Sequence, residues 1–256
     1  MWQNRIVKRF AWLFLFLLLI GGGFWIFLNK GPGKIEIVYE TKDMVQKRKD
    51  AKMAKTLEEF TKNQTGQYAI KVVRLMTGEN YGFDENATMA ARSVIKVPII
   101  LTAIRLGYEE KYNDLLLRMG VNSDNNAQVK IEKVVGKEEI KKTLMQLDMK
   151  DTDFDQNITT AEDLAKLWKY VYENKDSVEK YFVDSIYEDR ISKGIPEGVK
   201  LIHKVGTDVN IWNDSGIVVD TKTFILVILN QGVKREEAEK AVPEITKMVW
   251  DYEMSL

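Results

Sequence analysis

Residues 199–229 read VKLIHKVGTDVNIWNDSGIVVDTKTFILVIL and hold three stretches rich in β-branched residues. Val199–Val205, Gly216–Val219 and Thr223–Leu229 are predicted strands, because Gly, Asn and Asp separate them from one another. Residues 234–252 follow with apolar side chains on one helical face. Three neighbouring strands with short connections predict an antiparallel arrangement that ends in a C-terminal helix.

Two further strands are predicted near the other end of the chain. Gln67–Leu75 and Tyr81–Phe83 flank a Thr-Gly-Glu-Asn turn, which is a hairpin pattern. Residues 40–63 favour a helix before this hairpin, 93–107 a buried helix after it, and 108–180 several more helices. We therefore expect an α/β (α+β) fold, with a five-stranded antiparallel sheet, N- and C-terminal helices beside it, and an inserted, shortened all-helical lobe.

The first thirty residues differ from the rest and predict an N-terminal transmembrane helix. Phe10–Leu28 carries no charge and is long enough to reach nearly across a bilayer. Arg5, Lys8 and Arg9 precede it, so the positive-inside rule places the N-terminus in the cytoplasm and the later residues outside. A cleaved signal peptide is the alternative, but no small-residue cleavage site follows Leu28.

This topology gives a domain plan for a single-pass membrane protein. It consists of a cytoplasmic basic tail at 1–9, the membrane anchor at 10–28, a linker at 29–39 and an extracytoplasmic domain at 40–256. The membrane is thus an expected partner of the N-terminal helix.

Composition excludes several chemistries. The chain has 38 basic and 38 acidic residues, which argues against nucleic acid as a partner. It has no cysteine and one histidine, so neither a cysteine nucleophile nor a zinc site is expected, and no other metal is called for. A Ser-His-Asp triad would have to use His203, for which a packed strand residue is the simpler interpretation.

Three short motifs carry the candidate chemistry. Ser93 and Lys96 stand at i and i+3, so on a helix a hydroxyl and an amine share one face. A partly desolvated lysine has a lowered pKa and can accept the serine proton. Ser123-Asp124-Asn125 adds a second hydroxyl and an amide in a loop, and Lys204-Val205-Gly206-Thr207 ends a predicted strand. Each motif alone is common.

Together and in this order, the motifs resemble those of the class A β-lactamases and penicillin-binding proteins. The stretch Ala90–Pro98 is similar to the family's nucleophile helix, and Thr159–Leu164 to the helix after its omega loop. His203–Thr207 and Asn213–Ile217 are similar to two of its strands. The resemblance covers roughly residues 40 to 254 and implies no cofactor.

The resemblance implies a role for each matching residue. Ser93 would be acylated, with Lys96 as base, directly or through water, while Ser123 would pass a proton to the leaving nitrogen. Lys204 would hold the substrate carboxylate and keep the Ser123 proton mobile. Asn125 would contact the substrate side chain or Lys96, Gly206 and Thr207 would contact the substrate, and Asp124 is expected to be a structural anchor. The backbone N–H groups of Ser93 and Thr207 would form the oxyanion hole.

Three departures from the family limit this interpretation. The segment LDMKDTDFDQNIT at 147–159 has aspartates but lacks the Glu-x-x-Leu-Asn motif, whose glutamate activates the hydrolytic water. Val205 stands where the family has a Thr or Ser hydroxyl. Ser93 and Ser123 are only 30 positions apart (123 minus 93), which is why a shortened lobe is expected.

The leading hypothesis is a membrane-anchored serine hydrolase, β-lactamase-like or D,D-peptidase-like, that forms an acyl-enzyme at Ser93 with slow deacylation. Its substrate would be a β-lactam or a D-Ala-D-Ala-like peptidoglycan stem. A catalytically weak cell-wall-binding or scaffold protein on the same fold is the alternative, and an esterase is a third.

Overall fold

The computed structural model describes residues 41–256, and contacts divide the chain into two units, 1–52 and 53–256. Helix α2 (Lys42–Thr61) begins in the first unit and ends in the second. The predicted membrane span at 10–28 lies outside the described residues. Within residues 41–256, no helix is both long and apolar enough to cross a bilayer.

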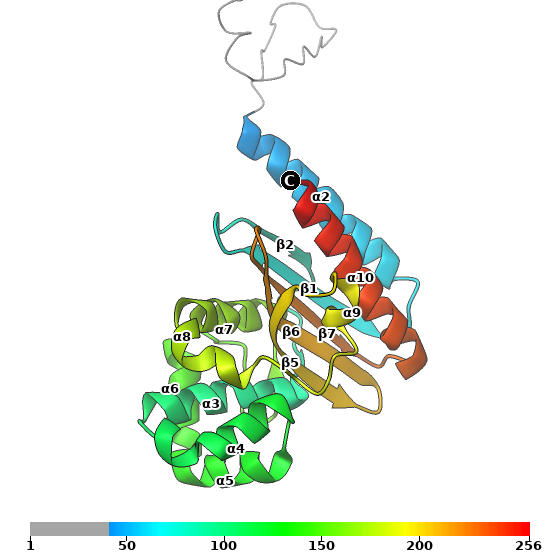
Figure 1. Cartoon of the computed structure of the whole chain (residues 1–256). Helices are drawn as coiled ribbons and strands as arrows, with labels where there is room; N and C mark the ends of the chain where they lie inside the picture. The colour runs from blue at the N-terminus through cyan, green and yellow to red at the C-terminus, as the bar shows by residue number, and fades with distance from the viewer. Residues whose placement is uncertain (1–40) are drawn as a thin grey trace, which may run out of the picture. The chain divides into compact units, whose positions relative to one another are not determined.

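A five-stranded sheet forms the centre of the larger unit, as expected, with every neighbouring pair antiparallel and the order β2-β1-β7-β6-β5 (Figure 1). The strands are β1 (Gln67–Arg74), β2 (Asn80–Phe83), β5 (Lys200–Asp208), β6 (Ile211–Val219) and β7 (Phe224–Gln231). β7 is the central strand, and its sequence FILVILNQ is apolar on both faces because both faces are covered.

One face of the sheet packs against helices from both ends of the chain. These are the last part of α2, the short α9 (Ile191–Gly194) and α10 (Arg235–Ser255), drawn in red in Figure 1. Leu226 and Ile228 alternate with residues of the other face and join Leu57 and Ile245 in this core cluster. A fully buried Leu or Ile contributes about 2 kcal/mol through the hydrophobic effect.

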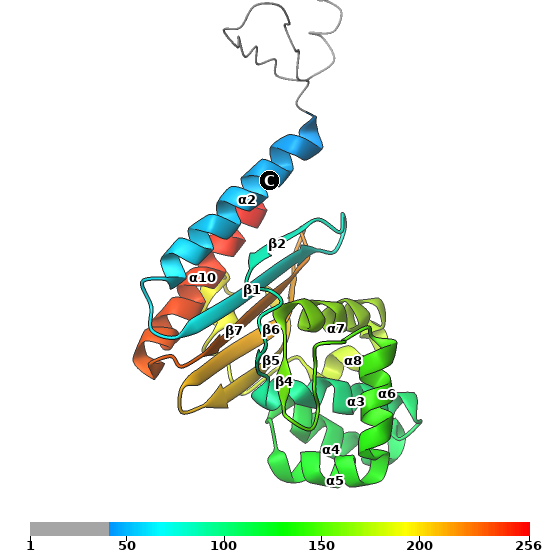
Figure 2. The same ribbon diagram turned by 180° about the vertical axis from the view of Figure 1, so that it is seen from behind.

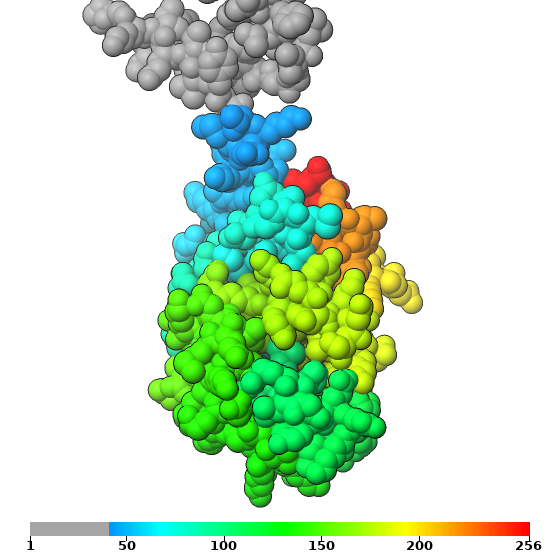
Figure 3. Space-filling view, turned by 90° about the vertical axis from the view of Figure 1, so that its left-hand side faces the viewer, coloured from blue at the N-terminus to red at the C-terminus, as the bar shows by residue number. Residues whose placement is uncertain are grey.

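The helical lobe covers the other face of the sheet (green in Figures 1 and 2). It contains α3 (Lys96–Arg105), α4 (Glu109–Val121), α5 (Asn125–Val135), α6 (Lys137–Gln146), α7 (Ala161–Glu173) and α8 (Lys175–Val178). Helix α7 contacts β1, β6 and β7, and its N-cap is Thr160, as its sequence indicates. The residues after α7, yellow-green in Figure 3, include the 3₁₀ turn η2 (Glu179–Tyr181), which packs on α4.

A short second ladder marks where the chain enters and leaves the lobe. β3 (Met89–Ala90) pairs with β4 (Ile158–Thr159), and Asp153 bridges to Ile158 to close a small hairpin at 153–158. Directly after β3 comes the 3₁₀ helix η1 (Arg92–Ile95), which leads into α3. Ser93 therefore lies on a 3₁₀ turn and not inside an α-helix, although its relation to Lys96 is kept, because i and i+3 are aligned in a 3₁₀ helix.

The strand limits differ from the sequence prediction around the Lys204 motif. β5 continues past Val205 to Asp208, and β6 begins at Ile211, five residues before the predicted start at Gly216. The polar residues Asn213, Asp214 and Ser215 look like a loop in the sequence, yet all three are buried in β6. They are tolerated there because they are hydrogen-bonded, as in the bond from the Trp168 indole to the Ser215 hydroxyl.

Candidate active site

Ser93 and Lys96 form the first pair of the site. The Lys96 amine donates to the Ser93 hydroxyl over 2.6 Å and to the Asn125 side-chain carbonyl over 2.8 Å. Val94 and Ile95, between them, are buried in the lobe core and fix the turn. The two residues lie as their spacing predicts, and Asn125 from α5 completes the contact.

Burial changes the acid–base properties of Lys96. Its residue is only 1% exposed, and this desolvation lowers the pKa of Lys96 to about 8, against the opposing effect of Asp124 and Glu132. About a tenth of such an amine is neutral at pH 7, compared with well under a thousandth at the ordinary lysine pKa. Lys96 can therefore accept a proton from the hydroxyl it contacts.

Ser123 and Lys204 form the second pair. The Lys204 amine donates to the Ser123 hydroxyl over 2.9 Å and to the carbonyl of Val205 over 3.3 Å. Ser123 has a φ of 57°, a left-handed conformation that few non-glycine residues adopt outside functional turns. Burial, followed by the charge of Lys96, lowers the pKa of Lys204 to about 7. The charge of Lys96 acts on Lys204, and Ser123 and Asn125 belong to the same three-residue motif, so the two pairs belong to one site.

Asp124 holds this loop in place, as expected. Its carboxylate caps α5 by accepting hydrogen bonds from the N–H groups of Asn126 and Ala127, and it also pairs with Arg118. The N–H of Ala127, followed by the Arg118 guanidinium, keeps the pKa of Asp124 below its usual value. Asp124 is thus a fixed anion at the start of the helix that presents Asn125.

Gly206 allows strand β5 to approach η1 closely. A Cβ at this position would lie 2.5 Å from the carbonyl oxygen of Ala91, a distance that real side chains do not reach. The absence of a side chain therefore lets the strand lie directly against the turn that carries Ser93. The next residue, Thr207, is exposed at the end of this approach.

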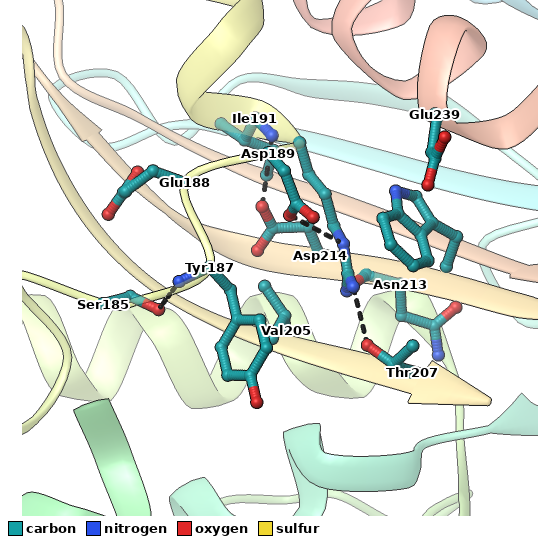
Figure 4. Close-up of polar contacts among 12 residues, drawn as sticks. Ser185, Tyr187, Glu188, Asp189, Ile191, Val205, Thr207, Asn213, Asp214 and Glu239 are labelled. Atoms are coloured by element: carbon teal, nitrogen blue, oxygen red, sulfur yellow. Dashed lines mark hydrogen bonds and ion pairs between the residues drawn. The ribbon is translucent and has the colours of Figure 1, made fainter. Parts of the chain in front are cut away.

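A buried arginine that sequence reasoning missed supports Thr207. Arg190 donates to the Thr207 hydroxyl over 2.6 Å and to the carbonyl of Asn213 over 2.5 Å. Its guanidinium lies 3.9 Å from the centroid of the Trp212 ring. Figure 4 shows Thr207, Asn213 and Asp189 around this position, with Val205 beside them. No motif marks residue 190, so only the fold reveals it.

His203 is a buried strand residue whose two ring nitrogens face carboxylates, which agrees with the simpler sequence interpretation. Its Nδ1 lies 2.9 Å from Asp214, and its Nε2 lies 3.4 Å from Glu188. Burial opposes a positive charge here, but Asp214 and then Glu188 outweigh it and raise the pKa of His203 to about 9. Among the described residues the ring contacts these two carboxylates and not Ser93, so the histidine does not build a triad with that serine.

The aspartates of 148–155 are engaged on the surface. Asp155 pairs with Lys137 at 2.7 Å and with Lys141 at 2.6 Å, and these partners lower its pKa to about 2. Asp148 pairs with Lys150 at 2.7 Å.

The other two aspartates are no better placed. The Asp153 carboxylate accepts two hydrogen bonds from Gln156 within its own hairpin, and Asp151 is exposed. None of the four contacts Ser93 or Lys96 in the described part of the chain.

The structure brings the predicted site residues together from both ends of the sequence. Lys96 is hydrogen-bonded to Ser93 and Asn125, and Lys204 is hydrogen-bonded to Ser123. Gly206 and Thr207 continue from Lys204 along β5. Among residues 41–256, no three His, Asp or Glu side chains are grouped so as to hold a metal ion.

Fold and site together define the superfamily of β-lactamase-like and penicillin-binding serine hydrolases. The chain belongs to the beta-lactamase enzyme family, whose model matches residues 101–253. This range includes Ser123 and Lys204 but begins after Ser93 and Lys96, so the pairing of those two depends on the geometry above. No curated protein sequence matches the chain.

Solved structures share this fold. PBP-A is similar over 80% of this chain and 97% of its own, with 16% identity and a TM-score of 0.72. The TLA-1 extended-spectrum β-lactamase is similar over 79% of this chain and 98% of its own, with 19% identity and a TM-score of 0.70. A β-lactamase from Sphaerobacter thermophilus is similar over 80% and 97%, with 16% identity and a TM-score of 0.70. At these identities the likeness establishes the fold.

Proposed function

We propose that the protein is a serine hydrolase that acylates Ser93 with an amide substrate bearing a nearby carboxylate. The observation that carries this proposal is the 2.6 Å contact between the Ser93 hydroxyl and a buried lysine whose pKa is lowered to about 8. Neutral Lys96 takes the hydroxyl proton as Ser93 Oγ bonds to the carbonyl carbon. The carbonyl oxygen becomes an oxyanion, which the backbone N–H groups of Ser93 and Thr207 stabilise.

The second half of acylation uses the second pair. The carbon–nitrogen bond breaks, the carbonyl re-forms, and Ser123 donates its hydroxyl proton to the departing nitrogen. Lys204, 2.9 Å away in its ammonium form, returns a proton to Ser123 and also attracts the substrate carboxylate. Asn125 and Thr207 contact the bound substrate, and the hydrogen bond from Arg190 leaves the Thr207 hydroxyl proton free to be donated.

The substrate class follows from this site and from one structural neighbour. A cationic residue beside a nucleophilic serine suits a β-lactam or a D-Ala-D-Ala-like peptide, in which an amide lies close to a carboxylate. A variant of PBP-A is known as an acyl-enzyme complex with penicillin G, on a fold that matches 80% of this chain with 15% identity.

Slow deacylation is part of the proposal. A water that attacks the acyl-enzyme needs a base, and the aspartates at 148, 151, 153 and 155 are paired, exposed or bonded within their own hairpin. The acyl group would therefore remain on Ser93, and β-lactam turnover would be weak. The apolar run at 10–28 further supports a catalytic domain tethered at the outer face of a membrane.

The test follows label retention and turnover in parallel. The full-length protein is incubated with a fluorescent penicillin and with a chromogenic cephalosporin. A stable fluorescent adduct that disappears in Ser93→Ala and persists in Ser177→Ala, an exposed serine of α8, is the expected result. Rapid cephalosporin hydrolysis would overturn slow deacylation. The absence of both adduct and turnover would overturn acylation of these substrates and favour a cell-wall-binding protein.

A further inference from the structure

An ion pair flanks the two residues whose N–H groups form the proposed oxyanion hole. Arg92 directly precedes Ser93, and Asp208 directly follows Thr207. The guanidinium of Arg92 contacts the carboxylate of Asp208 at 2.7 Å, and the two side chains are 40% and 39% exposed. The ion pair therefore joins η1 to the end of β5 at the surface, one residue away from each donor.

The contact between η1 and β5, which we call the seam, is made by Ala91–Ser93 and Gly206–Asp208. Below the ion pair it has no room for a side chain, because a Cβ on Gly206 would lie 3.3 Å from the Cβ of Arg92 as well as 2.5 Å from the Ala91 oxygen. Asn213 of β6 also donates to the carbonyl of Ala90 over 2.8 Å. The buried side of the seam is thus held by packing and by the hydrogen bond from Asn213.

The backbone of Arg92 is itself strained. Its φ of 52° lies in the left-handed region, which is unfavourable for a long side chain and persists only where the surroundings enforce it. In a relaxed backbone at residue 92, the peptide that carries the Ser93 N–H would turn away from its present direction. A contact is therefore needed to keep residue 92 in this conformation, and the ion pair between the Arg92 guanidinium and Asp208 is such a contact.

We propose that the Arg92–Asp208 ion pair is a positioning device for the oxyanion hole. It fixes the separation and direction of the N–H groups of Ser93 and Thr207, which come from two different elements, the turn η1 and the strand β5. Such donors act only when they lie about 3 Å from the developing oxyanion, so a small opening of the seam lowers the rate. This inference rests on the proposed acylation of Ser93.

Two physical arguments separate this role from simpler ones. Exposed ion pairs add little to stability, so loss of this pair should change the rate of acylation much more than the melting temperature. An anion beside an oxyanion hole repels the developing negative charge, so a purely electrostatic effect would make Asp208→Asn faster. Positioning makes the same variant slower. Asp208→Asn therefore distinguishes the two by the sign of its effect.

The experiment measures the acylation rate constant and the non-covalent binding constant for fluorescent penicillin by rapid mixing. The variants are Asp208→Asn, Arg92→Lys and the exchanged pair Arg92→Asp with Asp208→Arg, in which Asp tolerates the left-handed conformation. Glu139→Gln breaks the Arg105–Glu139 pair, whose side chains are 28% and 35% exposed, and is the matched control.

We expect Asp208→Asn to be acylated about tenfold more slowly with unchanged binding, since small misplacements of catalytic groups cost one to two orders of magnitude. Arg92→Lys keeps a cation opposite Asp208 and should retain most of the rate, and the exchanged pair should restore most of it. Glu139→Gln should match the unaltered protein. Equal or faster acylation of Asp208→Asn, or a rate as low as that of Asp208→Asn in both Arg92→Lys and the exchanged pair, would overturn the positioning role alone. An unaltered protein that is not labelled at all would instead overturn the proposed function.

Discussion

The lysines of the Ser93 site and the aspartates of the 148–155 segment differ in burial and in the charges beside them. Lys96 and Lys204 are each 1% exposed, and their amines contact hydroxyl and carbonyl oxygens. Burial lowers the pKa of Lys96 to about 8, and burial together with the charge of Lys96 lowers the pKa of Lys204 to about 7. Asp148 and Asp155 are exposed at the surface and contact lysines, and those partners lower their pKa values.

The difference separates a reactive group from an inert one. A buried amine that contacts hydroxyl and carbonyl oxygens, with carboxylates only farther away, is neutral for part of the time near physiological pH, as a base must be. A carboxylate that is already hydrogen-bonded to lysines is a weak base, because its partners would be lost when it takes a proton. The comparison supports the proposal that this chain acylates Ser93 and deacylates it slowly.

The largest effect is expected from Lys96→Ala. Removal of the base that contacts Ser93 should lower the acylation rate constant about a thousandfold, within the range for general bases, as measured by rapid mixing with fluorescent penicillin. Lys71→Met is the matched control, because Lys71 is also buried but pairs with Glu162 at 2.9 Å. A Lys96→Ala rate within tenfold of that of the unaltered protein would mean that another group is the base.

His203 is a buried cation that, unlike Lys96 and Lys204, lies directly beside carboxylates. Asp214 and Glu188 raise the pKa of His203 to about 9 from 6.5, despite burial. The stabilisation is therefore complete below pH 6.5 and is lost as the pH rises through about 9. The shift corresponds to about 3 kcal/mol, or a few hundredfold in the unfolding equilibrium, on the order of 10²–10³.

The measurement is urea unfolding of the unaltered protein and of His203→Gln at several pH values. The difference between their free energies of unfolding should narrow by about 3 kcal/mol between pH 6 and pH 10. Other titrating groups are common to both proteins and cancel in this difference. A gap that stays constant across this range would mean that His203 is neutral in the folded protein.

The pH dependence of acylation is the third prediction. With the pKa of Lys96 at about 8, the neutral fraction of its amine rises about tenfold between pH 7 and pH 9. The carboxylate of bound penicillin favours the ammonium form of Lys204, so at saturating penicillin the acylation rate constant should follow Lys96, rise by the same factor and then level off. The apparent midpoint belongs to both lysines, because their charges interact. A rate that is flat between pH 6 and pH 9 would contradict a lysine base.

Much of this picture was predictable from sequence, and particular residues show why. Alternating and continuous apolar runs such as FILVIL in β7 report directly on burial, so the sheet and its helices followed from periodicity. Thr160 was recognisable as an N-cap from the acidic first turn that follows it. The spacing of Ser93 and Lys96 was informative because both residues belong to one local turn.

The residues that escaped prediction depend on distant contacts. Arg190 and Asp214 are ordinary polar letters in the sequence, and their roles appear only when β5 and β6 pair and bring Thr207 and His203 beside them. The left-handed backbone of Arg92 and Ser123 leaves no mark either, because neither is a glycine. Pairing of the polar run 213–215 within β6 was missed because its partners lie in other segments.

The smallest effect, on the deacylation rate, is expected from substitutions of the aspartates at 148–155. Asp148→Asn, Asp151→Asn, Asp153→Asn and Asp155→Asn should each change the deacylation rate by less than about twofold, because none of these carboxylates contacts the Ser93 site. Release of fluorescent label from the preformed adduct measures this rate directly.

One of these four variants, Asp153→Asn, requires a control because its carboxylate holds the hairpin that carries Asn157 against Ala91. Gln156→Ala removes the side-chain half of that contact without touching the carboxylate, so it reports any change that comes from the hairpin alone. If release slows tenfold or more in one aspartate variant but not in Gln156→Ala, that aspartate is the hydrolytic base. The 148–155 segment would then approach the acyl group in the acyl-enzyme, and the proposal that the chain lacks a base for deacylation would be wrong.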